Sequence, residues 1–151
     1  MVLLISVIML GMLFVVPPLR RNGFYMLHML LVLAASWWIE KTYFPDKSPA
    51  DFIAGWKSVV LMFAVMHLMS INIVTFLAYG FDKRAAQKGE KRIPESQLHT
   101  LEFMGGWCGA ISGQKIFHHK TQKASYQSFF WAMLIFEVLA IYIILKYLHF
   151  I

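Results

Sequence analysis

Long uncharged stretches separated by short polar segments dominate the pattern of this chain. A helix that crosses a bilayer needs about 20 consecutive, mostly apolar residues. The segments between the stretches contain charged residues, prolines and glycines, which are typical of loops. The uncharged stretches cover residues 1–19, 23–39, 58–81 and 124–145, the last of which is interrupted only by Glu137. The pattern therefore predicts four membrane-spanning helices.

The composition agrees with an integral membrane protein. Of the 151 residues, 59% are hydrophobic, and the mean hydropathy is +0.60. These values exclude an ordinary soluble domain and predict a single all-α membrane domain over residues 1–151. The first stretch lacks the basic start of a signal peptide, and Pro17, Pro18 and two arginines replace the small residues of a cleavage site. We expect this stretch to remain in the protein.

The positions of lysine and arginine orient the predicted helices. Short cytoplasmic loops are rich in these residues, and the segment 82–123 is strongly basic. If residues 98–117 do not cross the membrane, ten of the 14 Lys and Arg residues face the cytoplasm, whereas eight face it if they do cross. The bias favours four spans, with both chain termini outside the cytoplasm and 82–123 as a basic cytoplasmic segment.

Local signals divide this basic segment into two helices. Residues 82–88 have a helix-forming composition and stop before Gly89, which suits the left-handed residue that follows many helices. Pro94 and Glu95 are typical of a first helical turn, where a missing N–H leaves nothing unpaired and a carboxylate faces the positive end of the dipole. We expect the second helix to continue through 98–117 as a Gly-rich interfacial or re-entrant helix.

Glycines at four-residue spacing mark this second helix. Gly105, Gly109 and Gly113 would form one flat stripe on a regular helix, and each costs about 1 kcal/mol relative to alanine in a helix interior. Such a cost is reasonable where another helix packs closely, as in membrane helix pairs. The alternative, a glycine-rich phosphate cradle, lacks the spacing of known phosphate-binding loops. The stripe therefore favours helix packing.

The basic segment also carries a family resemblance. It reads Asp82-Lys-Arg-Ala-Ala-x-x-Gly89-x-x-Arg92-Ile-Pro94-Glu95-x-x-Leu98-His99, then Gly105-Gly106-x-x-Gly109-Ala110 and His119-Lys120-Thr121-x-Lys123. In order and spacing, over residues 79–131, it resembles a bacterial membrane family of unknown function, domain of unknown function 1294. The resemblance implies a shared fold in the bacterial inner (cytoplasmic) membrane and no particular reaction. Some members carry a cold-shock domain ahead of the membrane part, where this chain has two predicted spans instead.

Basic residues around the Gly-rich helix form the first candidate site. They could be an anchor that keeps residues 98–117 from crossing the membrane, or a surface that binds an anionic partner. The partners to consider are anionic lipid head groups, a protein partner or second copy of the chain, and a nucleic acid. The candidate residues are Lys83, Arg84, Lys91, Arg92, His119, Lys120 and Lys123.

Polar residues inside the predicted spans form the second candidate site. An ionisable side chain in hydrocarbon costs several kcal/mol unless it finds a partner. Counted from the predicted cytoplasmic ends of their helices, His67 and Glu137 lie within about one turn of each other in depth. His28 lies much nearer the predicted cytoplasmic end of its helix, so we expect it at a different depth from His67. A structural hydrogen bond between His67 and Glu137 and a proton-relay or ligand site both stay open.

The sequence contains no specific catalytic or cofactor motif. His99, Cys108, His118 and His119 are irregularly spaced for a metal site, so we expect neither a metal nor a cofactor. The favoured function is non-enzymatic: a small inner-membrane subunit or docking module that presents the basic cytoplasmic surface to an anionic partner. The alternative is a small membrane enzyme or transporter that uses His67 and Glu137.

Overall fold

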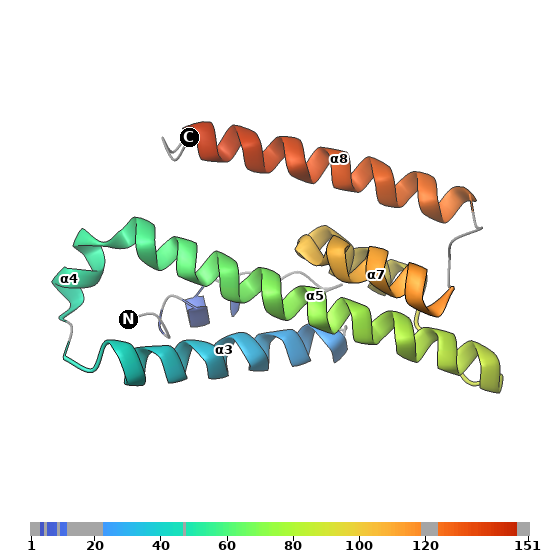
Figure 1. Ribbon diagram of the computed structural model, residues 1–151, viewed down its shortest axis with the longest axis horizontal. Helices are drawn as coiled ribbons and strands as arrows, with labels where there is room; N and C mark the ends of the chain where they lie inside the picture. The colour runs from blue at the N-terminus through green and yellow to red at the C-terminus, as the bar shows by residue number, and fades with distance from the viewer. Residues whose placement is uncertain are drawn as a thin grey trace. The chain divides into compact units, whose positions relative to one another are not determined.

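Helices make up the regular structure of the residues that the structure describes. The computed structural model describes residues 23–46, 48–118 and 124–147, together with 4, 6–8, 10 and 11 near the N-terminus. Within these ranges there is no strand, so the prediction of an all-α protein is confirmed for them. The elements are α3 (Gly23–Tyr43), α4 (Pro49–Ala54), α5 (Trp56–Lys88), α6 (Glu95–Leu101), the π-helix η1 (Glu102–Gly106), α7 (Trp107–Phe117) and α8 (Ala124–Tyr147) (Figure 1).

Three of these helices are long and apolar enough to cross a membrane. They are Gly23–Tyr43, Lys57–Lys88 and Ala124–Tyr147, and they coincide with three of the four predicted spans. The remaining predicted span, residues 1–19, lies mostly outside the described residues. The described helices are thus compatible with a membrane protein.

Helix α5 continues past the predicted end of its span at residue 81. The residues after Phe81 have a helix-forming composition, and the helix runs without interruption to Lys88. Gly89 then adopts φ +67°, the left-handed conformation expected of a residue that follows a helix. The predicted span and the first predicted basic helix are therefore one element.

The first compact unit comprises residues 1–74. In it, α3 and the first part of α5 lie side by side, as the contact of Ser36 with Met66 and the hydrogen bond of 2.9 Å between His28 and Ser70 indicate. A capping box at Ser48 begins the short helix α4 that connects them. Apolar side chains fill the interior of this unit, with Leu10, Val32 and Phe63 in one of its clusters.

The second compact unit comprises residues 75–151 and contains the end of α5, α6, η1, α7 and α8. The expected single helix over 98–117 is divided here, because Gly105 has φ 94° and bends the chain inside η1. Gly105 therefore does not lie on one regular helical stripe with Gly109 and Gly113. All three glycines are buried.

Two glycines of this region lie very close to the end of α5. A Cβ atom added to Gly106 would lie 2.1 Å from Thr75 Oγ1, and one added to Gly113 would lie 2.8 Å from Tyr79 Cβ. Carbon atoms cannot approach that closely, so any larger residue must push the two segments apart. The absence of a side chain at these positions sets how near η1 and α7 come to α5.

We predict that Gly113→Ala destabilises the protein relative to Gly23→Ala by about 1–3 kcal/mol, the usual cost of overpacking a filled interior. The methyl group at position 113 meets a Cβ atom that is fixed to the α5 backbone, whereas a Cβ at Gly23 meets nothing within 4 Å. Denaturant unfolding in a mild detergent measures both variants. Equal stabilities would contradict the close contact.

Candidate functional site

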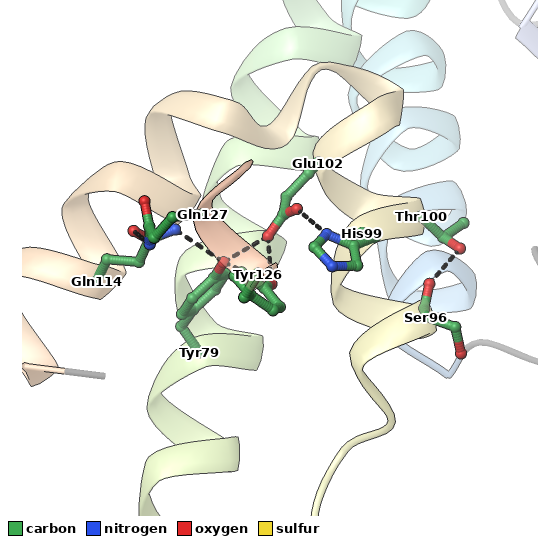
Figure 2. A network of polar contacts seen from close by, with 8 residues as sticks. All are labelled: Tyr79, Ser96, His99, Thr100, Glu102, Gln114, Tyr126 and Gln127. Atoms are coloured by element: carbon green, nitrogen blue, oxygen red, sulfur yellow. Dashed lines mark hydrogen bonds and ion pairs between the residues drawn. The ribbon is translucent and has the colours of Figure 1, made fainter. Parts of the chain in front are cut away.

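A buried carboxyl group, that of Glu102 in η1, is the centre of a polar cluster in the second unit (Figure 2). The hydroxyl groups of Tyr79 of α5 and Tyr126 of α8 both form hydrogen bonds with Oε1, the latter at 2.6 Å. His99 of α6 lies with Nδ1 2.6 Å from Oε2. The Glu102 side chain is only 1% exposed. One carboxyl group therefore joins residues from α5, α6 and α8. We call Tyr79, His99, Glu102 and Tyr126 the Glu102 cluster.

Two glutamines extend the Glu102 cluster. Gln114 of α7 donates from Nε2 to the Tyr79 hydroxyl at 3.1 Å, and Gln127 of α8 donates to Gln114 Oε1 at 2.7 Å. The hydroxyl oxygens of Tyr79 and Tyr126 are 2.8 Å apart. These contacts orient both phenols and bring α7 into the same network.

His99 connects the Glu102 cluster to the protein surface. Its ring stacks on Tyr126 with centroids 4.2 Å apart and also touches Phe129 at 4.6 Å. Its side chain is 16% exposed, much more than that of Glu102. His99 and Glu102 are three residues apart, so the helical path brings them onto one face. The π-helical turn that begins at Glu102 is a local form often found at functional sites.

A second buried carboxylate, Asp82, holds the segment after α5. It is fully buried and accepts hydrogen bonds from Arg92 Nη2 at 3.1 Å and from the backbone N–H of Ile93 at 2.9 Å. The hydrogen bond to Asp82 raises the pKa of Arg92 above its ordinary value. The left-handed turn at Gly89 reverses the chain so that Arg92 can return to α5. This ion pair neutralises Asp82.

A cavity of about 360 Å³ lies beside the end of α5. One part of its lining is apolar and the other is basic. Lys83 and Arg84 form no ion pair with any described residue, and neighbouring Asp82 is paired with Arg92. The lining residues are Leu77, Gly80, Phe81, Lys83, Arg84, Gln87 and Phe117.

Comparison with known proteins places these residues in a family. A family model described as a protein of unknown function (DUF1294) matches residues 72–126. The chain is also 34% identical over 80 residues to the uncharacterized protein YsdA of Bacillus subtilis (strain 168), an alignment that covers 53% of this chain and 90% of YsdA. The chain belongs to the DUF1294 family. No solved structure matches it.

The DUF1294 match contains the whole Glu102 cluster, the Asp82–Arg92 ion pair and the cavity lining. Several residues that carry the resemblance have identifiable structural tasks. Asp82 and Arg92 form the ion pair, Gly89 makes the left-handed turn, and His99 contacts Glu102. Leu98 is fully buried. The family segment thus contains its own packing contacts and polar partners.

The predicted basic residues of the DUF1294 segment do not form one group. Lys83 and Arg84 lie at the cavity, whereas Arg92 is paired with Asp82. Lys91 is exposed in the segment between α5 and α6. His119, Lys120 and Lys123 lie outside the described residues.

The polar residues of the predicted spans have different surroundings from those expected. His67 Nδ1 lies 3.1 Å from His28 Nε2, and His28 Nδ1 lies 2.9 Å from Ser70 Oγ. The expectation that His28 and His67 lie at different depths was therefore wrong, because Gly23 and Phe81, from which the two depths were counted, do not lie level with each other. Glu137 is half-buried in the second unit, and its pairing with His67 stays a prediction.

Tyr79, Glu102 and Tyr126 were not predicted as site residues. A usable signal was present, since Glu102 is an acidic residue in an apolar, glycine-rich stretch and follows His99 at helical spacing. The two tyrosines carry no such signal, because they lie 23 and 24 residues from Glu102 in the sequence. Among the described residues, no group of three His, Cys, Asp or Glu side chains is arranged to hold a metal ion.

We predict that Asp82 and Arg92 are energetically coupled by about 1–2 kcal/mol. Hydrogen bonds to charged groups are worth up to about 3 kcal/mol, and the half-exposed Arg92 side chain reduces that value by solvent screening. A double-mutant cycle with Asp82→Asn and Arg92→Gln, followed by unfolding in detergent, gives the coupling free energy.

The exposed pair Lys88–Glu90, with N and O atoms 3.9 Å apart, is the matched control in the same region. Its cycle, with Lys88→Gln and Glu90→Gln, should give less than about 0.5 kcal/mol. Equal coupling in the two cycles would show that burial of Asp82 adds nothing.

Proposed function

We propose that this DUF1294 protein is a small inner-membrane docking module that binds an anionic partner at the basic end of α5. The observation that carries the proposal is the cavity of about 360 Å³, in which Lys83 and Arg84 lie beside the apolar side chains of Leu77, Phe81 and Phe117. A ligand that fits this lining has a negative group and an apolar part. Both are features of a phospholipid.

An anionic phospholipid fits this cavity better than a nucleic acid or an acidic protein does. The guanidinium group of Arg84 can bind phosphate oxygens through two parallel hydrogen bonds, and Lys83 adds a point charge. Apolar surface beside these cations suits an acyl chain and contributes nothing to a nucleic-acid backbone. Basic residues next to a membrane span gain about 1 kcal/mol each from anionic head groups.

The charges around the cavity support the same partner. Asp82 adjoins Lys83 in sequence, but its carboxylate is buried against Arg92 and Ile93. Glu90 lies 3.9 Å from Lys88 in an exposed ion pair. Neither acid neutralises Lys83 or Arg84, so the cavity keeps a positive charge for an anionic ligand.

The proposal includes a bacterial inner membrane, four spans and both termini outside the cytoplasm. In that orientation the end of α5 faces the cytoplasm, and the Gly-rich chain from 98 to 117 is interfacial or re-entrant and does not cross. Support comes from the Lys and Arg residues, most of which then lie on the cytoplasmic side. The cavity would adjoin the leaflet that carries the anionic lipids.

Cysteine labelling tests this orientation. In a Cys108→Ser background, we expect Glu90→Cys and Gln122→Cys to react with a membrane-impermeant reagent only after the cytoplasmic side is exposed, because both lie in the basic segment. Tyr147→Cys, at the other end of α8, should react from outside. Labelling of positions 90 and 122 from opposite sides would rule out the proposed topology.

Lipid binding to the detergent-purified protein tests the docking function. We expect phosphatidylglycerol to bind and the zwitterionic phosphatidylcholine to bind weakly, as measured by native mass spectrometry with lipid titration. The double variant Lys83→Gln, Arg84→Gln should lose about 2 kcal/mol of affinity for phosphatidylglycerol, roughly 30-fold.

The control double variant is Lys41→Gln, Lys146→Gln, which removes two other exposed lysines that do not line the cavity. It should bind phosphatidylglycerol like the unmodified protein. Equal losses in the two double variants would mean that net charge alone decides binding. No preference for phosphatidylglycerol over phosphatidylcholine would contradict the lipid as partner.

A further inference from the structure

The Glu102 cluster has more hydrogen-bonding contacts than hydrogens to fill them. Its four contacts join Glu102 to Tyr79, to Tyr126 and to His99, and Tyr79 to Tyr126. If Glu102 is a carboxylate, only three hydrogens are available, one from each phenol and one from His99 Nδ1. One contact would then bring two polar atoms together with no hydrogen between them.

The deficit lies among three oxygen atoms. Glu102 Oε1 and the hydroxyl oxygens of Tyr79 and Tyr126 form a triangle, with 2.6 Å from Tyr126 to Glu102 and 2.8 Å between the phenols. Two phenolic hydrogens cannot fill three sides. Gln114 donates to the Tyr79 hydroxyl from outside the triangle at 3.1 Å, so it supplies no hydrogen to any side.

We propose that the carboxyl group of Glu102 is a proton-binding site and that a proton on Oε1 supplies the missing hydrogen. Each side of the triangle then has a donor, while His99 Nδ1 keeps its contact with Oε2. A neutral carboxyl group also costs less to bury than a carboxylate does. The ligand of this site is a proton, and the inference does not depend on the proposed docking function.

The groups that face Glu102 are consistent with this assignment. The titratable side chains in contact with it are Tyr79 from α5, His99 from α6 and Tyr126 from α8, while α7 contributes only the neutral Gln114 to the network. No lysine or arginine of the described chain contacts the carboxyl group. Arg92 is paired with Asp82.

His99 is the route by which the proton exchanges with solvent. Its side chain is 16% exposed, whereas Tyr79 and Tyr126 are 0% and 2% exposed. A proton taken up at His99 Nε2 lets Nδ1 pass its own proton to the carboxyl oxygen that faces it. Rotation of the carboxyl group then brings that proton into the oxygen triangle, and the ring returns through exchange with solvent to the tautomer that has its hydrogen on Nδ1. The net change is the uptake of one proton from water.

Proton binding is linked to how firmly the helices are held. With the proton bound, every contact among α5, α6 and α8 in this cluster contains a hydrogen. Without it, one side of the oxygen triangle is repulsive, and the contact through Tyr126 to α8 is the one that can separate. Proton occupancy and the attachment of α8 therefore shift together.

Infrared spectroscopy of the purified protein tests the site directly. A carboxylic acid has a carbonyl band that shifts in heavy water and that a carboxylate lacks. We expect Glu102→Gln to remove one such component and Glu137→Gln, the control, to leave that component unchanged. If Glu102→Gln leaves the carboxylic-acid region unchanged at every pH at which the protein stays folded, the proposal is overturned.

A second variant distinguishes two causes of Glu102 protonation, the shortage of hydrogens in the cluster and the burial of the carboxyl group. Tyr126→Phe removes two contacts and one hydrogen, which leaves two contacts and two hydrogens, so Glu102 no longer needs a proton to satisfy them. We expect the Glu102 band to weaken or disappear in this variant. Protonation caused only by burial predicts the opposite, because loss of a hydroxyl group makes the site less polar.

The phenylalanine ring keeps the stacking on His99, and circular dichroism with thermal unfolding checks that the fold is retained. Tyr79→Phe makes the same change in the count and provides an independent variant, while Tyr25→Phe in the first unit is the control. A Glu102 band that is unchanged or stronger in both Tyr126→Phe and Tyr79→Phe would overturn the proposed role of the hydrogen deficit.

Discussion

The packing of the second unit depends on the hydrogen bonds of one buried carboxyl group. Glu102 is almost completely buried, and a polar group in that position costs several kcal/mol unless it is hydrogen-bonded. Its partners Tyr79, His99 and Tyr126 come from three different helices. Since the loss of any one partner removes a hydrogen-bonding contact from the buried carboxyl group, the same contacts that stabilise Glu102 also favour the way in which α5, α6 and α8 meet.

Backbone geometry makes that meeting possible. The bend at Gly105, with φ 94°, lets the chain leave α6 and begin α7 in a new direction. The missing side chain of Gly113 then allows α7 to approach the Cβ atom of Tyr79. Tyr79 is therefore held from one side by packing and from the other by hydrogen bonds. Tyr79 thus takes part both in a close contact with the α7 backbone and in the hydrogen bonds of a buried carboxyl group. This explains why small residues and buried polar residues occur together in this segment.

Long uncharged stretches predict the long helices, because a helix that can span a membrane is apolar at nearly every consecutive residue. The stretches 23–39, 58–81 and 124–145 all correspond to described helices. Relative depth was less predictable, because the sequence does not show how the ends of α3 and α5 are offset. His28 and His67 therefore touch where unequal depths were expected. The Glu102 cluster escaped prediction for a different reason. Its tyrosines are more than 20 residues away in sequence, and an isolated tyrosine in an apolar helix gives no sign of which distant acid it will meet.

Within the described part of the chain, the buried residues of helix α8 lie at one end. Its buried residues, Tyr126 and Phe130, both lie near its beginning, and only 6% of its most apolar window is buried in the protein. The later turns of the helix are largely exposed in the described chain. We therefore expect evolutionary drift to be unequal along α8, with many apolar residues interchangeable in its later turns and few replacements accepted near Tyr126.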